Sequence, residues 1–275
     1  MKLPKTPFVI LLILALLYAR TFQWLVRAWL NDPYYSHGFL VMIIAGFFTW
    51  RAFRTFEPSE VRDPAPYQKG LIVFAVGLFL YTAGFITLFP FLMALSFLFT
   101  LSGLVLFFYG KPLMRALLFP IAYLMFAIPL PAEFLDLLGY QLQALSARYP
   151  AALLTLLGIP VTRVGAEIYL ADAAFTIGLP CSGMNSLIAL LALAALFTVL
   201  LQCAWYRKVA LFCSAVPIAL FANITRVTAL LLIGHRYGAE TATGFYHTLF
   251  SPLLFIIAFI CLIGLSILTG CKVRV

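Results

Sequence analysis

The chain has 275 residues, of which 64% are hydrophobic and only 10% are charged, and its mean hydropathy is +1.08. A soluble domain is about half apolar and about a quarter charged, so the composition excludes an ordinary soluble protein and predicts a membrane protein. The net charge of +9 comes from Lys and Arg residues that lie mostly between apolar segments. That distribution is typical of the positive-inside bias of membrane proteins, and we expect no nucleic-acid partner.

About eight apolar segments are long enough to cross a bilayer, which takes roughly 20 residues for a core ~30 Å thick. The first follows two lysines, but no small-x-small cleavage site precedes Arg20, so we interpret it as a retained helix rather than a signal peptide. Prolines interrupt the fourth and fifth segments, where they end or kink helices. The sequence therefore predicts an all-α polytopic membrane protein with spans at 7–28, 37–53, 70–89, 91–109, 114–130, 182–203, 208–233 and 248–269.

The basic residues also orient the chain. If the N-terminus is cytoplasmic, most Lys and Arg residues fall in the segments on the inner side, as the positive-inside rule requires. We therefore expect a multi-pass protein of the cytoplasmic (inner) membrane with both termini in the cytoplasm. The proline-containing loop 51–69 is then expected to be cytoplasmic and irregular.

The longest outer segment, 131–181, is expected to form a small extracytoplasmic cap. Its first part has leucines at helical spacing, including Leu135, Leu138 and Leu142, which predicts one helix lying in the membrane interface. Its second part alternates over 164–170 and again over 175–177, with Ala171-Asp172 between, which predicts a short β-hairpin. We thus expect a single integral membrane domain, 1–275, with a cap at 131–180 and a catalytic three-helix part at 182–269.

Three reactive side chains are predicted at one depth, near the outer membrane surface. Cys181 stands at the outer start of the sixth span and His247 at the outer start of the eighth. Arg226 lies 18 residues beyond Lys208 in the seventh span, which corresponds to about 27 Å of helix. This placement brings a thiol, a guanidinium and an imidazole to the same level.

Cys181 differs from the other cysteines because Pro180 and Ser182-Gly183 predict a sharp entry into a helix. A sulfur at a helix N-terminus lies at the positive end of the dipole, which favours the thiolate. No CxxC pair or regular spacing indicates a disulfide framework or a zinc site. The remaining cysteines are therefore expected to be small buried hydrophobes: Cys203, Cys213, Cys261 and Cys271.

Arg226 is a functional candidate because a charge inside a span is costly unless it is paired or hydrated. Asn223 lies three residues earlier on the same helix face, so the two side chains are expected to enter one polar cavity. The alternative is an arginine that extends to the outer surface while its stem stays in the membrane.

The histidines allow more than one interpretation. His247 is either an acid/base group or an interfacial histidine, and His37 and His235 also lie on the outer side. Together with Cys181 they form a conceivable metal site, but no HExxH motif or paired spacing supports it. We therefore expect no metal and no cofactor.

The three residues make chemical sense together as an acyl-transfer site. Cys181 supplies a nucleophile and His247 carries protons to and from the leaving and attacking amines. Arg226 stabilises the oxyanion of the tetrahedral intermediate.

The chain resembles the exosortase/archaeosortase family of membrane cysteine transpeptidases. The likeness rests on Cys181-Ser182-Gly183 opening one span, Asn223-Ile224-Thr225-Arg226 late in the next, and His247 opening the last. Supporting features are Ser36-His37-Gly38, Ile128-Pro129-Leu130-Pro131 and the stretch GIPVTRVGAEIYL before the cysteine.

The resemblance implies that Cys181 is the nucleophile, Arg226 the transition-state stabiliser and His247 the acid/base. It implies a thiol protease/transpeptidase whose substrates are secreted proteins with a C-terminal sorting signal, made of a motif, a transmembrane helix and a basic tail. These proteins would be cleaved through a thioester and passed to a surface acceptor, a lipid or glycan of unknown identity; membrane lipid is the other expected partner. Supporting or substrate-binding roles fall to Asn223, Ser182, Gly183, Ser186 and His37.

Two other functions are compatible with the residues. A transporter or a lipid-linked polysaccharide handling protein would use Arg226 to bind an anionic group and would not need Cys181. A membrane metalloenzyme would use the outer histidines. For the thiol enzyme, the edge of the predicted hairpin is expected to bind the extended sorting motif by strand addition.

Overall fold

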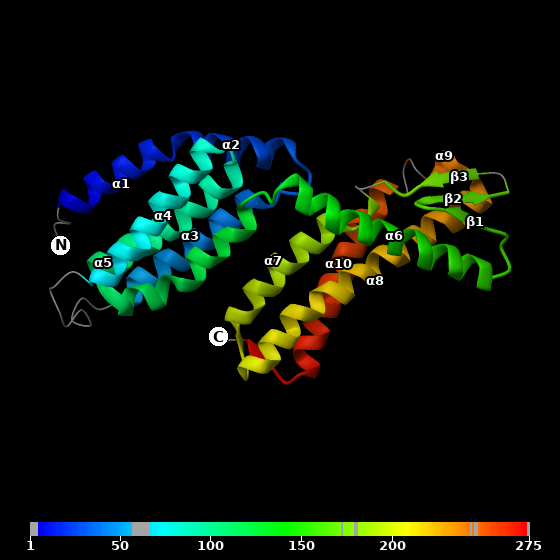
Figure 1. Cartoon of the computed structure of the whole chain (residues 1–275). Helices are drawn as coiled ribbons and strands as arrows, with labels where there is room; N and C mark the ends of the chain where they lie inside the picture. The colour runs from blue at the N-terminus through cyan, green and yellow to red at the C-terminus, as the bar shows by residue number, and fades with distance from the viewer. Residues whose placement is uncertain are drawn as a thin grey trace. The chain divides into compact units, whose positions relative to one another are not determined.

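The structure is a computed structural model that describes residues 5–56, 67–171, 173–178, 181–242, 244 and 247–273. The chain divides into two compact units, residues 1–130 and 131–275, whose ribbons are drawn in Figure 1. Among the described residues, four helices are long and apolar enough to cross a membrane: Gly38–Thr55, Gln68–Ile86, Pro90–Ala127 and Trp205–Tyr237. Two shorter apolar helices are Met184–Leu200 and Pro252–Leu268. The predicted class, an all-α polytopic membrane protein with a small β element, is confirmed.

All regular secondary structure in the described part of the first unit is helical. Its elements are α1 (Lys5–Leu17), α2 (Ala19–Asn31), α3 (Gly38–Thr55), α4 (Gln68–Ile86), α5 (Pro90–Tyr123) and the 3-10 helix η2 (Leu124–Ala127). Two details differ from the predicted spans: the first is divided at Tyr18, and the fourth and fifth form one run whose backbone turns at Gly110, with φ +71°. Most of the predicted irregular loop, residues 57–66, lies outside the described residues.

Helices α4 and α5 form a close pair because glycines remove side chains from their interface. A Cβ atom on Gly77 would lie 2.4 Å from the Oγ1 atom of Thr100, and one on Gly103 would lie 2.4 Å from the backbone nitrogen of Phe74. The fully buried Tyr18 joins this pair, since its hydroxyl hydrogen-bonds Ser96 and Thr100 at 2.9 Å each. A polar group in a low-dielectric interior must be satisfied in this way.

Side chains of α2 and of the loop before α3 make hydrogen bonds to the backbone at the end of the same unit. Trp29 donates from Nε1 to the Ala127 carbonyl at 2.7 Å, and the Tyr35 hydroxyl accepts from the Leu130 backbone N–H at 2.8 Å. Burial raises the pKa of Tyr35 to about 12, which keeps its hydroxyl protonated. These contacts fix residues 127–130 at the end of the unit.

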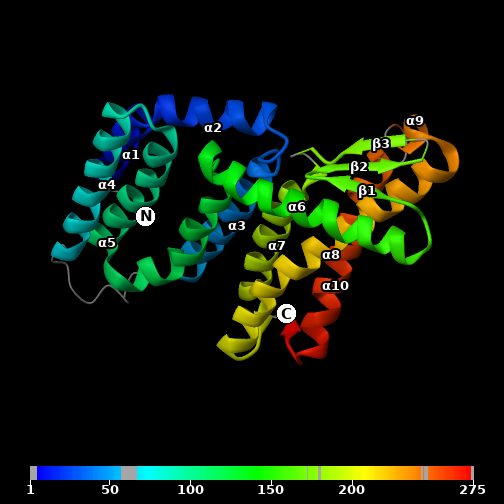
Figure 2. The ribbon, with the colours of Figure 1, turned by 45° about the vertical axis from the view of Figure 1, so that its right-hand side comes forward.

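The second unit contains the predicted site residues apart from His37. Its elements are α6 (Ala132–Leu156), β1 (Thr162–Val164), β2 (Glu167–Leu170), β3 (Ala173–Thr176), α7 (Met184–Leu200), β4 (Leu201–Gln202), α8 (Trp205–Tyr237), α9 (Ala239–Thr241), α10 (His247–Leu268) and β5 (Lys272–Val273). Helices α7, α8 and α10 run side by side, and α6 crosses them at the end that carries the three-stranded sheet (Figure 2).

The predicted hairpin is part of a three-stranded antiparallel sheet in the order β1-β2-β3. The antiparallel pairing of Leu170 with Ala173 confirms the predicted hairpin between β2 and β3. The run 164–170, which alternation suggested as one strand, is instead broken after Val164, which pairs with Glu167. Gly165 makes this second tight turn with φ +62°, a conformation that glycine adopts without steric cost.

The sheet packs on α6 and on the C-terminal half of α8. Ile168 and Phe175 point inward and share a core with Leu154 and Leu231. A Cβ atom on Gly234 would lie 2.2 Å from the Cζ atom of Phe175, so the glycine makes room for the ring. This packing fixes β3 against α8 at Gly234, about two turns of helix beyond Arg226.

One prediction was wrong at the end of the helical layer that lies away from the three-stranded sheet. We expected no disulfide and assigned Cys203 and Cys271 as small buried hydrophobes, but the two form a disulfide. They meet because β4 pairs with β5, Leu201 opposite Val273, at the ends of α7 and α10. A separation of 68 residues without a motif gives no sign of this pairing in the sequence.

Candidate active site

Cys181 lies in a turn between β3 and α7. Its backbone N–H donates to the Gly178 carbonyl at 2.9 Å, and α7 begins at Met184 with Gly183 as its N-cap. The cysteine therefore precedes the helix cap by two residues instead of opening the helix as predicted, which weakens any influence of the dipole. Pro180, to which the sharp entry was attributed, lies outside the described residues.

Arg226 reaches this turn from α8. The residue is 7% exposed, and its guanidinium makes a side-chain hydrogen bond with Cys181. Both residues line a cavity of about 60 Å³ with Phe175, Ile177 and Leu231. The predicted thiol and guanidinium are thus neighbours in one cavity.

Asn223 connects the two elements that carry these residues. Its Nδ2 atom donates to the Cys181 carbonyl at 3.0 Å and to the Ser146 hydroxyl at 2.7 Å. Ser146 in turn donates to the Ser182 carbonyl at 3.3 Å. One buried network therefore holds α6, α8 and the Cys181 turn together.

Gly183 allows this network to form. Its φ is +87°, and a Cβ atom there would lie 2.7 Å from Cγ of Asn223. The position therefore requires glycine both for the backbone conformation and for the close approach of the Asn223 amide.

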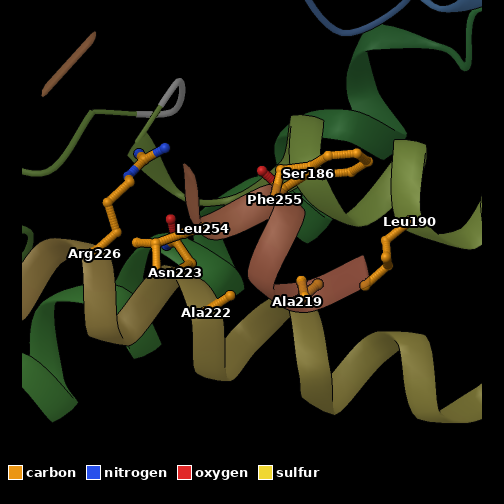
Figure 3. Close-up of a pocket in the computed structure, with 9 residues that line it drawn as sticks. Ser186, Leu190, Ala219, Ala222, Asn223, Arg226, Leu254 and Phe255 are labelled. Carbon is orange, nitrogen blue, oxygen red and sulfur yellow. The ribbon is translucent and has the colours of Figure 1, made fainter. Parts of the chain in front are cut away.

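The remaining serines lie around the same centre. Ser182 is 1% exposed, and its hydroxyl accepts a hydrogen bond from the Met184 N–H at 3.4 Å. Ser186 lines a second, smaller cavity between α7, α8 and α10, together with Asn223 and Arg226. Figure 3 shows Asn223 and Arg226 extending from the same side of α8 into this space.

His247 is the first residue of α10, and its side chain lies outside what the structure describes. Its level follows from the antiparallel register of α8 and α10. Arg207 donates to the Thr269 carbonyl at 2.8 Å, and Ala222 lines the smaller cavity with Phe255. The same register puts the His247 backbone opposite Leu230, one helical turn, or about 6 Å, beyond Arg226.

The other two histidines have separate surroundings. His37 belongs to the first unit, where its Nε2 atom hydrogen-bonds the Phe126 carbonyl at 3.1 Å. His235 lies exposed in the last turn of α8. In the described part of the chain, no three His, Cys, Asp or Glu side chains gather as metal ligands do.

Two residues of the site were missed because the first part of the cap was interpreted only as an interfacial helix. Ser146 is fully buried, and Gln143 donates from Nε2 to the Ile177 carbonyl at the end of β3. They lie three residues apart on the face of α6 that also buries Gly139 and Ala147. Polar side chains among small ones on one helix face were the available signal.

The fold and this centre define a polytopic helical membrane protein in which a cysteine and an arginine share a buried cavity. The family model described as transmembrane exosortase matches residues 29–264, so the chain belongs to the transmembrane exosortase family. The family indicates a sorting transpeptidase or protease of the cysteine type. A comparison with curated proteins and one with solved structures found no match.

Proposed function

We propose that this protein cleaves secreted proteins at a C-terminal sorting signal through a thioester on Cys181 and transfers them to a surface acceptor. The observation that carries the proposal is the contact between the Cys181 side chain and the buried Arg226 guanidinium. The thiolate is the nucleophilic form of a cysteine, and a guanidinium beside it stabilises the oxyanion that attack on a carbonyl creates. Family membership supports the same chemistry.

In the first step the Cys181 thiolate attacks the scissile carbonyl, and a C–S bond forms as the carbonyl oxygen becomes an oxyanion. Arg226 stabilises that oxyanion, because its planar fork offers fixed donors in a site from which water is largely excluded. His247 donates a proton to the amine as the C–N bond breaks. The signal's helix and basic tail leave as an amine, and the protein remains as a thioester.

In the second step an acceptor nucleophile replaces the enzyme. His247 removes a proton from the acceptor's attacking group, the tetrahedral intermediate forms again, and the Cys181 thiolate leaves. Water in place of the acceptor gives hydrolysis by the same route. Asn223 supports both steps by holding the Cys181 carbonyl, which keeps the sulfur in one position.

The test is cleavage of a co-encoded secreted protein that ends in a motif, an apolar helix and a basic tail. Cys181→Ala should leave this substrate at full length in cells. Cys213→Ala is the matched control, because Cys213 is an exposed thiol outside the disulfide on the same helix as Arg226, and it should process normally. Normal processing by Cys181→Ala would overturn the proposal and favour an anion-binding role for Arg226.

The proposal places the site on the extracytoplasmic face, with both termini in the cytoplasm. Two exposed positions report on this orientation: Val164 in β1, 62% exposed, and Trp205 at the start of α8, 75% exposed. In intact cells, a membrane-impermeant maleimide should label Val164→Cys and leave Trp205→Cys unlabelled until lysis. Labelling of Trp205→Cys but not of Val164→Cys in intact cells would contradict the proposed orientation and indicate the reverse one.

A further inference from the structure

Strand β3 leads directly to the nucleophile and forms an edge of the sheet. Among the described residues β3 pairs only with β2. The Ile177 N–H donates to the Ala166 carbonyl at 3.0 Å, which fixes the hydrogen-bonded positions of the ladder. Because bonded and non-bonded pairs alternate in an antiparallel ladder, the backbone groups of Ala174 and Thr176 face away from β2.

The cavity shared by Cys181 and Arg226 lies between this strand and α8. Phe175 and Thr176 of β3, together with Ile177 after the strand, form one wall. The other walls are apolar residues from α8 and the segment after α9: Val227, Leu230, Leu231 and Ala242. Apart from the thiol, the guanidinium and the Thr176 side chain, the lining is therefore hydrophobic.

We infer that the outer edge of β3 and this cavity together bind the substrate as an extended strand, with one branched aliphatic side chain in the cavity. The inference rests on the proposed function and adds the binding mode and the preferred residue. The backbone groups of Ala174 and Thr176 pair with the substrate main chain, as in other cases of strand addition. The side chain beside the scissile carbonyl enters the cavity between β3 and α8.

The direction of the bound strand follows from the course of β3. The strand runs towards α7, and Cys181 lies between these two elements in the chain. A substrate that continues into a membrane helix after its cleavage site runs the same way, from the secreted part towards the membrane. The substrate strand is therefore parallel to β3, and its paired residues precede the scissile bond.

The size of the cavity limits the side chain. A cavity needs about 10–15 Å³ to hold one water molecule. The cavity beside Cys181, of about 60 Å³, therefore holds roughly four to six groups of that size. Valine and leucine side chains have three and four carbons and fit this space. Phenylalanine is too large, and a carboxylate would lose its hydration against an apolar wall.

Peptidyl chloromethyl ketones test the proposed side-chain preference of the cavity without knowledge of the sorting motif. The probe is acetyl-Ala-Ala-Xaa chloromethyl ketone, in which the thiolate attacks the methylene carbon, a C–S bond forms and chloride leaves. The rate of Cys181 alkylation in the purified protein is measured by peptide mass mapping, with iodoacetamide as a reagent that needs no strand pairing. We expect Xaa as Val or Leu to react about tenfold or more faster than Phe or Asp.

Two variants test the strand pairing and the cavity binding independently. Thr176→Pro removes an N–H that faces away from β2, a position where an edge strand accepts proline, and should slow the Val probe by about three- to tenfold. Arg163→Pro places a proline on β1, the exposed strand at the other edge of the sheet, and should react like the wild type. Ala242→Leu fills the cavity from its fully buried wall and should shift the preference to Gly and Ala.

The outcomes distinguish this inference from the proposed function. An unchanged iodoacetamide rate in each variant shows that Cys181 remains folded and reactive. Equal rates for all side chains, or a Thr176→Pro variant with the wild-type Val rate, would overturn the inference even if cleavage depends on Cys181. Cleavage that persists in Cys181→Ala would overturn the proposed function instead.

Discussion

The side-chain amide of Asn223 donates to the main-chain carbonyl of Cys181 at 3.0 Å. Through this bond α8, which also carries Arg226, holds the turn that carries the thiol. The same amide nitrogen donates to the buried Ser146 hydroxyl of α6, so three elements share one polar centre. Buried networks of this kind are stable only when each member is satisfied.

Asn223→Ala should lower kcat by about tenfold or more, because it removes two hydrogen bonds worth about 0.5–1.5 kcal/mol each and leaves the Cys181 turn less restrained. Ser146→Ala removes one of these bonds and keeps the contact between Asn223 and the Cys181 carbonyl, so its kcat should fall less. Steady-state cleavage of the substrate by both variants measures this order. Equal activity of Asn223→Ala and wild type would show that the amide does not position the thiol.

Gly183→Ala should destabilise the protein and abolish cleavage, because its Cβ atom would lie 2.7 Å from Asn223 Cγ. Gly158→Ala is the matched control, since Gly158 also has a positive φ, +79°, but a Cβ atom there meets nothing within 4 Å. The control should lose only the conformational cost of about 1–2 kcal/mol and keep its activity. Thermal unfolding in detergent compares the two, and equal losses would contradict the contact with Asn223.

Arg226→Lys should reduce kcat by about 10²–10³, because a lysine keeps the charge but loses the planar fork that offers several fixed donors. Arg163→Lys, on the exposed strand β1, is the control and should turn over normally. The comparison uses kcat and KM measured on one substrate. A fully active Arg226→Lys variant would show that a positive charge alone is sufficient.

The first unit should lose stability in acid through His37. Burial lowers the pKa of this imidazole below its usual 6.5, against the opposing effect of hydrogen bonds to the Phe126 and Tyr34 backbone. The unfolded state therefore binds the proton more readily, so the stabilisation is fully present above pH 6.5 and is lost as the pH falls through the folded pKa. His37→Gln keeps a donor for the Phe126 carbonyl without titrating.

The measurement is the melting temperature in detergent as a function of pH. The wild type should lose more stability than His37→Gln as the pH decreases below 6.5. Parallel curves for the two proteins would contradict a buried, neutral His37.

The sequence predicted most of the membrane helices, because long apolar segments identify themselves by length and composition. It also singled out Cys181 and Arg226, since a polar turn before a helix and a charge within a span are both exceptional in a membrane protein. The structure brings these two side chains into contact, and the proposed chemistry depends on that contact.

Other features depend on contacts between distant segments, which a single sequence does not encode locally. Ser146 is one of several polar residues in α6, and its place in the site depends on the packing of α6 against α8. The bond between Cys203 and Cys271 requires the chain to return after 68 residues. The break at Gly165 was hidden because its flanking residues continue the alternation of a strand.

The most direct test of the central claim is to trap the acyl-enzyme. Purified protein and substrate are mixed and quenched in acid, and Cys181 is examined by peptide mass mapping with and without hydroxylamine. We predict a thioester that joins Cys181 to the new C-terminus of the substrate and disappears with hydroxylamine. Cleavage that proceeds without any adduct on Cys181, and equally fast in Cys181→Ala, would contradict the account.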